Sequence, residues 1–157
     1  MDLSKVIKEE RINLNLNAKS KDEVINELTD LLVETGSVAN KEGFLKDVYA
    51  REEIGETGMG GYIAIPHGKS AHVAKTAIAI GRTYEEIEWG SLDGKGVKLI
   101  ILFAVPEEDK TSVHVKLLAQ VASILGDEEK CQELLTVKST EDILEIMSNN
   151  KKGKEVC

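Results

Sequence analysis

One histidine of this chain, His67, lies in a segment that could present its imidazole ring for chemistry. The apolar residues 63–65 favour the end of a short strand, and Pro66 fixes its own φ and keeps the preceding residue extended. Gly68 leaves the backbone after the ring free to adopt a positive φ. The pattern predicts a stiff turn that points the side chain of His67 in few directions. A solvated turn whose middle residue happens to be histidine is the alternative that turn chemistry alone favours.

Groups that suit an oxyanion lie elsewhere in the sequence. Arg51 is expected near the end of a helix, just before a glycine-rich loop at 58–61 whose backbone amides could donate to an anion. His114 falls in the first turn of another expected helix, where backbone N–H groups are free and the helix dipole is positive. An imidazole nucleophile among such groups suits phosphoryl transfer. The alternative is structural, with His67 a turn residue and His114 a core contact at a helix end.

Several better-known motifs fail on inspection. A P-loop ending at Gly68-Lys69-Ser70 and a dinucleotide fingerprint starting at Gly58 both require a glycine where Ile63 stands. His67 and His72 are five residues apart rather than four, with Gly68 between them, which disfavours a helical metal site. No G-x-S-x-G elbow is present. We therefore expect no cofactor and no metal.

Composition indicates one globular domain, residues 1–157. A chain of 157 residues with 41% apolar content can bury a substantial core. Its net charge of −8 disfavours nucleic acid and anionic membranes as partners. The first residues lack the apolar region of a signal peptide, and the longest apolar run, 99–105, is too short to cross a bilayer, so we expect a cytoplasmic protein.

The two cysteines predict no chemistry. Cys131 and Cys157 have no paired spacing typical of a disulfide or a metal site, so both are expected to be reduced thiols. Cys157 lies in a C-terminal tail, 149–157, that we expect to be frayed, most clearly over 151–157.

The first third of the chain predicts a strand and two helices. Alternating polar and apolar residues over 11–16 favour a strand with one buried face. Ser20 and Glu23 form a capping box that starts a helix ending at Gly36. An apolar stripe predicts the second helix over 41–53.

The remainder predicts a sheet covered by helices. The nearly unbroken apolar run 97–105 favours a strand buried on both faces, as in the α/β classes. The other expected elements are strands at 63–65 and 76–81, a turn-rich connector at 88–96 with a half-buried Trp89, a polar loop at 106–112, and helices at 114–125, 128–135 (capped by Asp127) and 141–147 (capped by Ser139 or Thr140).

Two motifs carry a resemblance to a known family. The first is Arg51-Glu52-Glu53 followed by Thr57-Gly58-x-Gly60 and Ile63-Ala64-Ile65-Pro66-His67-Gly68-Lys69, and the second is Pro106-Glu107 with His114-Val115-Lys116-Leu117-Leu118-Ala119-Gln120. Over about 11–147 the chain resembles the enzyme IIA domain of the fructose/mannitol (type 2) family of the bacterial phosphoenolpyruvate-dependent sugar phosphotransferase system.

The resemblance implies a three-layer α/β/α sandwich with a mixed, mainly parallel central sheet. It implies that His67 accepts a phosphoryl group from the carrier protein HPr and passes it to a IIB domain, usually onto cysteine. His114 and Arg51 would then hold phosphoryl oxygens, whereas His72 has no implied role and is expected at the surface. The membrane IIC permease would be an indirect partner and would set which sugar is served.

Two other functions remain open. One is a regulatory phosphoacceptor resembling the nitrogen-regulatory branch of the same family, in which phosphorylation switches a protein interaction and no sugar moves. Tyr62 and Val115 depart mildly from common family residues and blur the subfamily, although the Thr57-Gly58-x-Gly60 loop leans toward the sugar side. The other is a non-catalytic α/β binding module in which the His67 turn is incidental.

Overall fold

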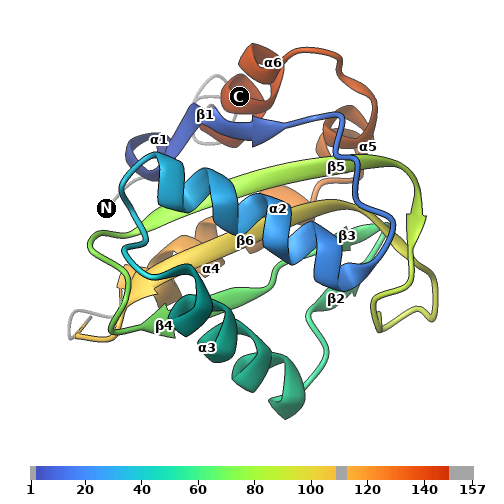
Figure 1. The fold of residues 1–157 in the computed structure, drawn as a ribbon. Coiled ribbons are helices and arrows are strands. Elements are labelled where there is room, and N and C mark those ends of the chain that lie inside the picture. Colours follow the sequence, from blue (N-terminus) through green and yellow to red (C-terminus); the bar gives the residue numbers. More distant parts are fainter. Residues whose placement is uncertain (1–2, 109–112, 149–157) are drawn as a thin grey trace.

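The computed structural model describes residues 3–108 and 113–148, with a central sheet between two helical layers (Figure 1). In chain order the elements are α1 (Leu3–Val6), β1 (Ile7–Asn13), α2 (Lys21–Glu34), α3 (Lys41–Ile54), β2 (Gly58–Gly60), β3 (Ile63–Ala64), β4 (His67–Ser70), β5 (Ala77–Ile87), β6 (Val97–Pro106), α4 (Val113–Leu125), α5 (Glu128–Thr136) and α6 (Thr140–Ser148). None of the helices in the described ranges is long and apolar enough to span a membrane.

The sheet is mixed, in the order β1-β5-β6-β3-β2, with β4 also pairing with β6. The pairs β1–β5, β3–β6 and β4–β6 are parallel, whereas β5–β6 and β2–β3 are antiparallel. Helices α2 and α3 cover one face, and α1, α4, α5 and α6 lie on the other (Figure 1). The predicted α/β/α sandwich with a mixed, mainly parallel sheet is confirmed.

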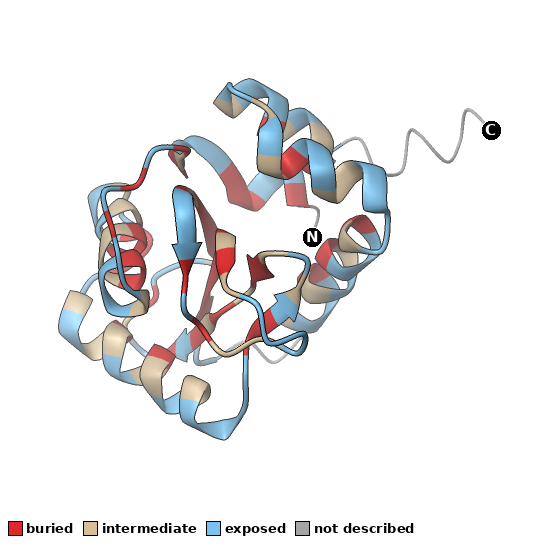
Figure 2. Ribbon diagram, turned by 90° about the vertical axis from the view of Figure 1, so that its right-hand side faces the viewer, coloured by how far each residue is buried: buried red, intermediate tan, exposed pale blue. Residues whose placement is uncertain are grey.

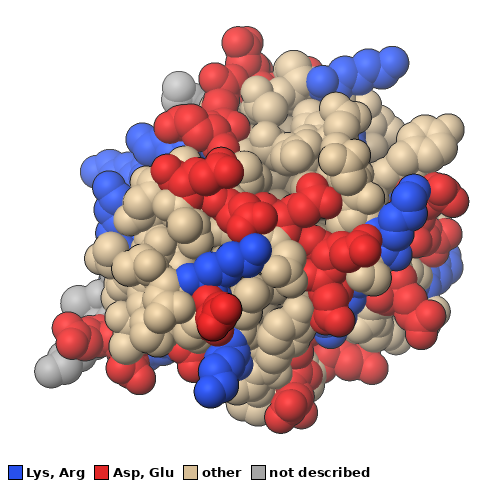
Figure 3. Space-filling view, in the orientation of Figure 1, with Lys and Arg blue, Asp and Glu red and all other residues tan. Residues whose placement is uncertain are grey.

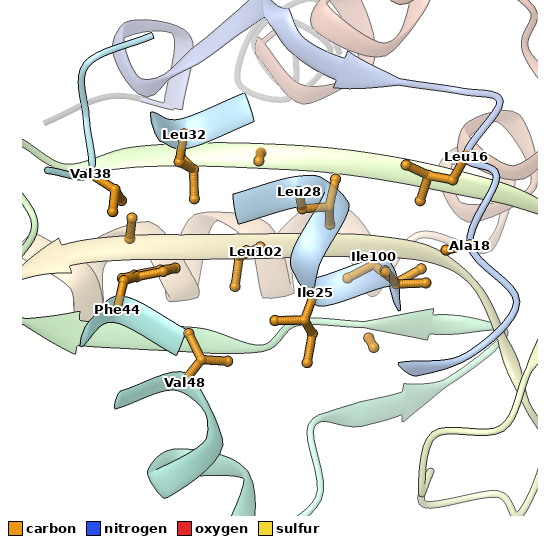
Figure 4. Packing of buried hydrophobic residues seen from close by; sticks show 14 of the residues in the cluster. Leu16, Ala18, Ile25, Leu28, Leu32, Val38, Phe44, Val48, Ile100 and Leu102 are labelled. Carbon is orange, nitrogen blue, oxygen red and sulfur yellow. The ribbon is translucent and has the colours of Figure 1, made fainter. Parts of the chain in front are cut away.

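Strand β6 is the centre of the core because both of its faces are buried. Its alternate residues Ile100, Leu102 and Ala104 pack with the apolar sides of α2 and α3 (Figure 4). Leu99, Ile101, Phe103 and Val105 pack on the opposite side with α4, α5 and α6. This alternation follows from the two-residue period of a strand. The inward sides of the helices are buried and their outer sides exposed (Figure 2).

The helix starts follow the capping residues. The hydroxyl of Ser20 accepts a hydrogen bond from Glu23 N at 3.2 Å, while the Glu23 carboxylate accepts from Lys19 N at 2.7 Å. Asp127 caps α5, and Ser139 Oγ accepts from Asp142 N at the start of α6.

The first strand lies earlier than predicted, at 7–13 instead of 11–16. It ends at Asn13, whose side-chain oxygen accepts from Asn15 N at 2.9 Å and turns the chain. Leu14 and Leu16 are buried as the alternation required, but they lie beyond the strand. The alternation predicted that Arg11 would be on the polar, exposed face. Instead it is buried and donates to the carbonyls of Val6 and Ile78.

Other boundaries shift modestly. Strand β5 extends to Ile87, beyond the predicted end at 81, because it pairs with β6 as far as Val97. Part of the polar loop predicted at 106–112, the tail 149–157 and Cys157 lie outside the described residues.

Candidate functional site

His67 begins strand β4 and does not lie on the predicted turn. Its residue pairs in parallel with Phe103, and Pro66 O accepts a hydrogen bond from Phe103 N at 3.0 Å. Gly68 has no positive φ. A Cβ on it would instead lie 2.7 Å from Val48 Cγ2 and 2.8 Å from a ring carbon of Phe44. Glycine is therefore required for the close approach of β4 to α3, and the expected conformational freedom was wrong.

The strand geometry places the imidazole on the side of the sheet that α4 covers. Adjacent residues of a strand point to opposite faces, and Gly68 faces α3. Phe103, opposite His67 in the parallel pair, packs with α4. The ring of His67 is half-buried.

Both ring nitrogens of His67 have hydrogen-bond partners. Arg51 Nε lies 3.1 Å from His67 Nε2, and His67 Nδ1 lies 3.3 Å from the carbonyl oxygen of Ile65. A guanidinium can only donate, so Nε2 must be the acceptor and carry the lone pair. The proton of the neutral ring then resides on Nδ1 and is donated to Ile65 O.

Electrostatics favour the neutral ring. Burial lowers the pKa of His67, and electrostatic interactions with Arg51 and His114 lower it further. The hydrogen bond to Ile65 O and the carboxylate of Glu52 act in the opposite direction without reversing the shift. The ring is therefore neutral near pH 7 and suited to nucleophilic attack.

The three residues predicted for the site come together. Arg51 lies in the last turn of α3, and its Nη1 also donates to Gly55 O at 3.1 Å. His114, half-buried in the first turn of α4, is close enough to affect the pKa of His67. Residues far apart in the sequence thus place two cationic or potentially cationic side chains around one neutral imidazole.

The glycine-rich loop does not join them. Gly58–Gly60 forms β2, and Gly60, Gly61 and Tyr62 make its connection to β3 with positive φ values of 87°, 63° and 69°. The Gly61 amide donates to Asp93 at 3.2 Å. Ile63 pairs with Leu99, four residues before the partner of His67, which separates this turn from the imidazole by about 13 Å along β6. The amides of Gly60 and Gly61 therefore lie away from the imidazole, whereas Gly58 pairs with Ala64 of β3.

His72 is not simply a surface residue. It is half-buried, and its ring packs so closely on α3 that a Cβ on Gly43 would lie 2.3 Å from it. It contacts Gly43 near the start of α3, whereas Arg51, the partner of His67, lies in the last turn of that helix, so His72 serves as a comparison histidine in experiments.

Four interacting residues, Thr57, Glu52, Trp89 and Lys21, were not predicted as part of the site. One of them, Glu52, is the residue next to Arg51. Thr57 Oγ lies 2.9 and 2.7 Å from the carboxylate oxygens of Glu52 and accepts from Trp89 Nε1 at 2.9 Å. Lys21 forms an ion pair with Glu52. Trp89 is only 6% exposed, not half-buried as predicted. A buried indole N–H needs a hydrogen-bond acceptor. The single tryptophan of the sequence could therefore have predicted a buried polar partner, although not which residue it is.

Acidic side chains are spread over the face that α2 covers (Figure 3), among them the exposed Asp22, Glu23, Asp30 and Glu34. A separate cavity of about 830 Å³ lies between the β2–β3 turn and the junction of α4 with α5. Its described lining residues include none of the three predicted site residues.

Comparison with known proteins identifies the family of this chain. Residues 5–150 match the family model of the phosphoenolpyruvate-dependent sugar phosphotransferase system, EIIA 2. The mannitol-specific phosphotransferase enzyme IIA component of Bacillus subtilis is 32% identical over 146 residues, which cover 91% of this chain and 96% of that protein. The chain spans about a quarter of the length of two larger relatives: 23% of a mannosylglycerate-specific EIIABC component of Escherichia coli (31% identity, 95% of this chain) and 24% of a fructose-specific EIIABC component of B. subtilis (31% identity, 97% of this chain).

Solved structures share the fold over nearly the whole chain. The nitrogen regulatory protein IIA-Ntr from Neisseria meningitidis matches with a TM-score of 0.84 and 32% identity, covering 92% of this chain and 97% of that one. Mannitol enzyme IIA of E. coli, solved in complex with phosphorylated enzyme IIB, matches with a TM-score of 0.78 and 25% identity, covering 92% and 100%. The chain therefore belongs to the EIIA type 2 family of the phosphoenolpyruvate-dependent sugar phosphotransferase system.

Proposed function

We propose that this protein is cytoplasmic, accepts a phosphoryl group from phospho-HPr on His67 and passes it to an enzyme IIB domain during coupled sugar uptake and phosphorylation. The observation that carries the proposal is the hydrogen bond from Arg51 Nε to His67 Nε2, at 3.1 Å. It marks Nε2 as the nitrogen with the free electron pair and places a cation where phosphoryl oxygens would arrive. A half-buried ring is also accessible to a donor carried on another protein.

In the first step the electron pair of Nε2 attacks phosphorus, and the bond between phosphorus and the HPr imidazole breaks. The HPr ring leaves with the bonding electrons and takes up a proton from solvent. The proton on His67 Nδ1 stays in place because Ile65 O accepts it. Arg51 releases Nε2 and donates to the incoming oxygens instead, a movement within the reach of one side chain.

In the second step the phosphorus is attacked by the IIB acceptor, expected to be a cysteine thiolate, and the bond to Nε2 breaks. His67 leaves as the neutral ring from which it began, so no net proton is left on it. Arg51 and His114 stabilise the equatorial oxygens in both directions. Their role is electrostatic and geometric, since phosphoryl transfer requires little covalent chemistry from the protein.

The comparisons support transfer to a IIB domain in particular. A relative of similar fold is described as a complex with phosphorylated enzyme IIB, and others are described as mannitol- or fructose-specific. HPr as donor, the IIC permease as indirect partner, the phosphohistidine intermediate and transport as the purpose are part of our proposal.

A regulatory role is the second candidate because specific matches favour it. IIA-Ntr of N. meningitidis shares the fold with a TM-score of 0.84, and a nitrogen regulatory protein of Klebsiella oxytoca is 28% identical over 99% of this chain. In that case phosphorylated His67 would change the affinity for a regulated protein. Transfer of label onward to a panel of IIB domains would favour transport, whereas phosphorylation without such transfer would favour regulation.

The decisive experiment uses labelled phosphoenolpyruvate with enzyme I and HPr. We expect acid-labile label on the protein, its loss in His67→Ala, and its retention in the control His72→Ala, which removes the comparison histidine. Retention of label in His67→Ala would overturn the assignment of His67. Absence of label on the parental protein would favour a non-catalytic binding module.

A further inference from the structure

We propose that Thr57, Glu52, Lys21 and Trp89 form a positioning network that holds Arg51 on His67 Nε2. The network does not touch the imidazole, so its members are positioning residues. Its consequence for phosphoryl transfer rests on the proposed function, whereas its effect on the Arg51–His67 hydrogen bond does not.

Thr57 is the centre of the network and is almost fully buried. Its hydroxyl donates to the Glu52 carboxylate and accepts from the indole N–H of Trp89, so both of its hydrogen-bonding capacities are used. Lys21 pairs with Glu52, donates to Trp89 O at 3.4 Å and lies 5.1 Å from the centre of the Trp89 ring. Each partner therefore holds at least two others, which makes the geometry mutually dependent.

Thr57 is connected to both hydrogen bonds of the His67 ring. Its backbone oxygen accepts from Ile65 N at 2.9 Å, and the carbonyl of that same Ile65 accepts from His67 Nδ1. Its side chain fixes Glu52, the residue next to Arg51. Two residues before Thr57, Gly55 O accepts from Arg51 Nη1. A shift of Thr57 would thus disturb the tautomer of His67 and the orientation of Arg51 together.

The network also satisfies the carboxylate of Glu52. Arg51 and Glu52 are consecutive residues of α3 and do not face each other, so Glu52 takes its partners from other segments. Here the carboxylate of Glu52 is occupied by Thr57 and Lys21, and its side chain is only 6% exposed. Arg51 is left to donate to His67 and Gly55, and later to phosphoryl oxygens.

The test compares Thr57→Val, which keeps the shape but removes the hydroxyl, with Thr57→Ser, which keeps the hydroxyl. Nitrogen NMR of the unphosphorylated full chain would follow Arg51 Nε–H and His67 Nε2. We expect Thr57→Val to shift both signals and to slow phosphorylation by phospho-HPr about tenfold, since small misplacements of catalytic groups have effects of this order or larger. Thr57→Ser should keep the NMR signals and the phosphorylation rate close to those of the parental protein.

Epistasis separates positioning from general stability. In an Arg51→Gln background, Thr57→Val should cause a much smaller further loss of rate than in the parental protein, because only the connection through Ile65 to His67 remains. A second tenfold loss there would overturn the proposal, and so would unchanged NMR signals in Thr57→Val. If Thr57→Val does not fold, Lys21→Met is used in its place with the same expected shifts. Failure of the parental protein to become phosphorylated would refute the proposed function, while the NMR comparison would still decide the network.

Discussion

The two sides of His67 are built by different interactions. On the side of α3, Arg51 is held by hydrogen bonds and by an ion-paired neighbour, with contributions from α2, α3 and the β5–β6 connector. On the side of α4, His114 is placed by a helix whose Leu117 and Val121 are completely buried in the core. Polar bonds thus fix one flank, whereas apolar packing fixes the other. Substitutions on the two flanks should therefore fail in different ways.

The largest effect is expected on the polar flank. Arg51→Gln removes the cation that donates to His67 Nε2, and the rate of phosphorylation by phospho-HPr should fall about 100-fold, or about 2.7 kcal/mol, as for the loss of one preorganised donor. Lys46→Gln is the control, because it removes an exposed positive charge from the same helix. Equal phosphorylation rates for Arg51→Gln and the parental protein would show that the Arg51 cation does not contribute to the reaction.

Gly68→Ala tests how tightly the polar flank is packed. Its added Cβ would enter the space of Val48 and Phe44, and we expect a loss of about 2 kcal/mol in the free energy of unfolding, measured with denaturant. Gly55→Ala is the matched control, because its backbone is extended and no atom lies within 4 Å of the added Cβ. A Gly68→Ala protein as stable as this control would show that β4 can move away from α3.

A smaller effect is expected on the apolar flank. His114→Ala should still accept label from phospho-HPr, because Arg51 and the neutral ring of His67 remain. Its transfer to a IIB domain should slow about tenfold, or about 1.4 kcal/mol, owing to the loss of one group that stabilises the phosphoryl oxygens. Onward transfer at the parental rate would show that His114 has no such role.

The smallest effect is a difference in titration. NMR titration of His67 should give a midpoint below the ordinary value of about 6.5. Arg51→Gln and His114→Ala should each raise this pKa by removing an unfavourable electrostatic interaction with the protonated ring, Arg51→Gln by more because its contribution is larger. A larger increase in the pKa of His67 in His114→Ala than in Arg51→Gln would show that the apolar flank has the stronger electrostatic effect on the ring.

The same shift makes folding depend on pH in a defined direction. A lowered pKa means that the unfolded chain binds a proton more readily than the folded one. The contribution of His67 to stability is therefore present above about pH 6.5 and is lost as the pH falls through the folded pKa. In His67→Gln this part of the acid sensitivity should disappear from denaturant unfolding curves.

The sequence predicted those features that local signals determine. The capped helix after Ser20, the helix over 41–53 and the buried strand at 97–105 were right within a residue or so at each end, apart from the first helix, which stops two residues before Gly36. The resemblance supplied the family, and the structure brings Arg51, His67 and His114 together.

What the sequence could not predict depends on contacts between distant segments. Strand β4 forms because β6 offers it a parallel partner, which no turn rule at Pro66 can foresee. Thr57 reads locally as a loop residue, and only its 2.9 Å approach to the indole of Trp89, 32 residues away, reveals its function in the site. The role of Gly68 likewise required knowledge of which helix lies above it.

The parallel pairing of both β3 and β4 with β6 has a consequence for chain length. Ile63 and His67 are each tied to a fixed residue of the same central strand, Leu99 and Phe103. The stretch between them can exchange side chains but cannot gain or lose a residue without turning the imidazole toward α3. Natural or engineered variation in this region should therefore occur by substitution, with insertions and deletions confined to connections outside the two pairings.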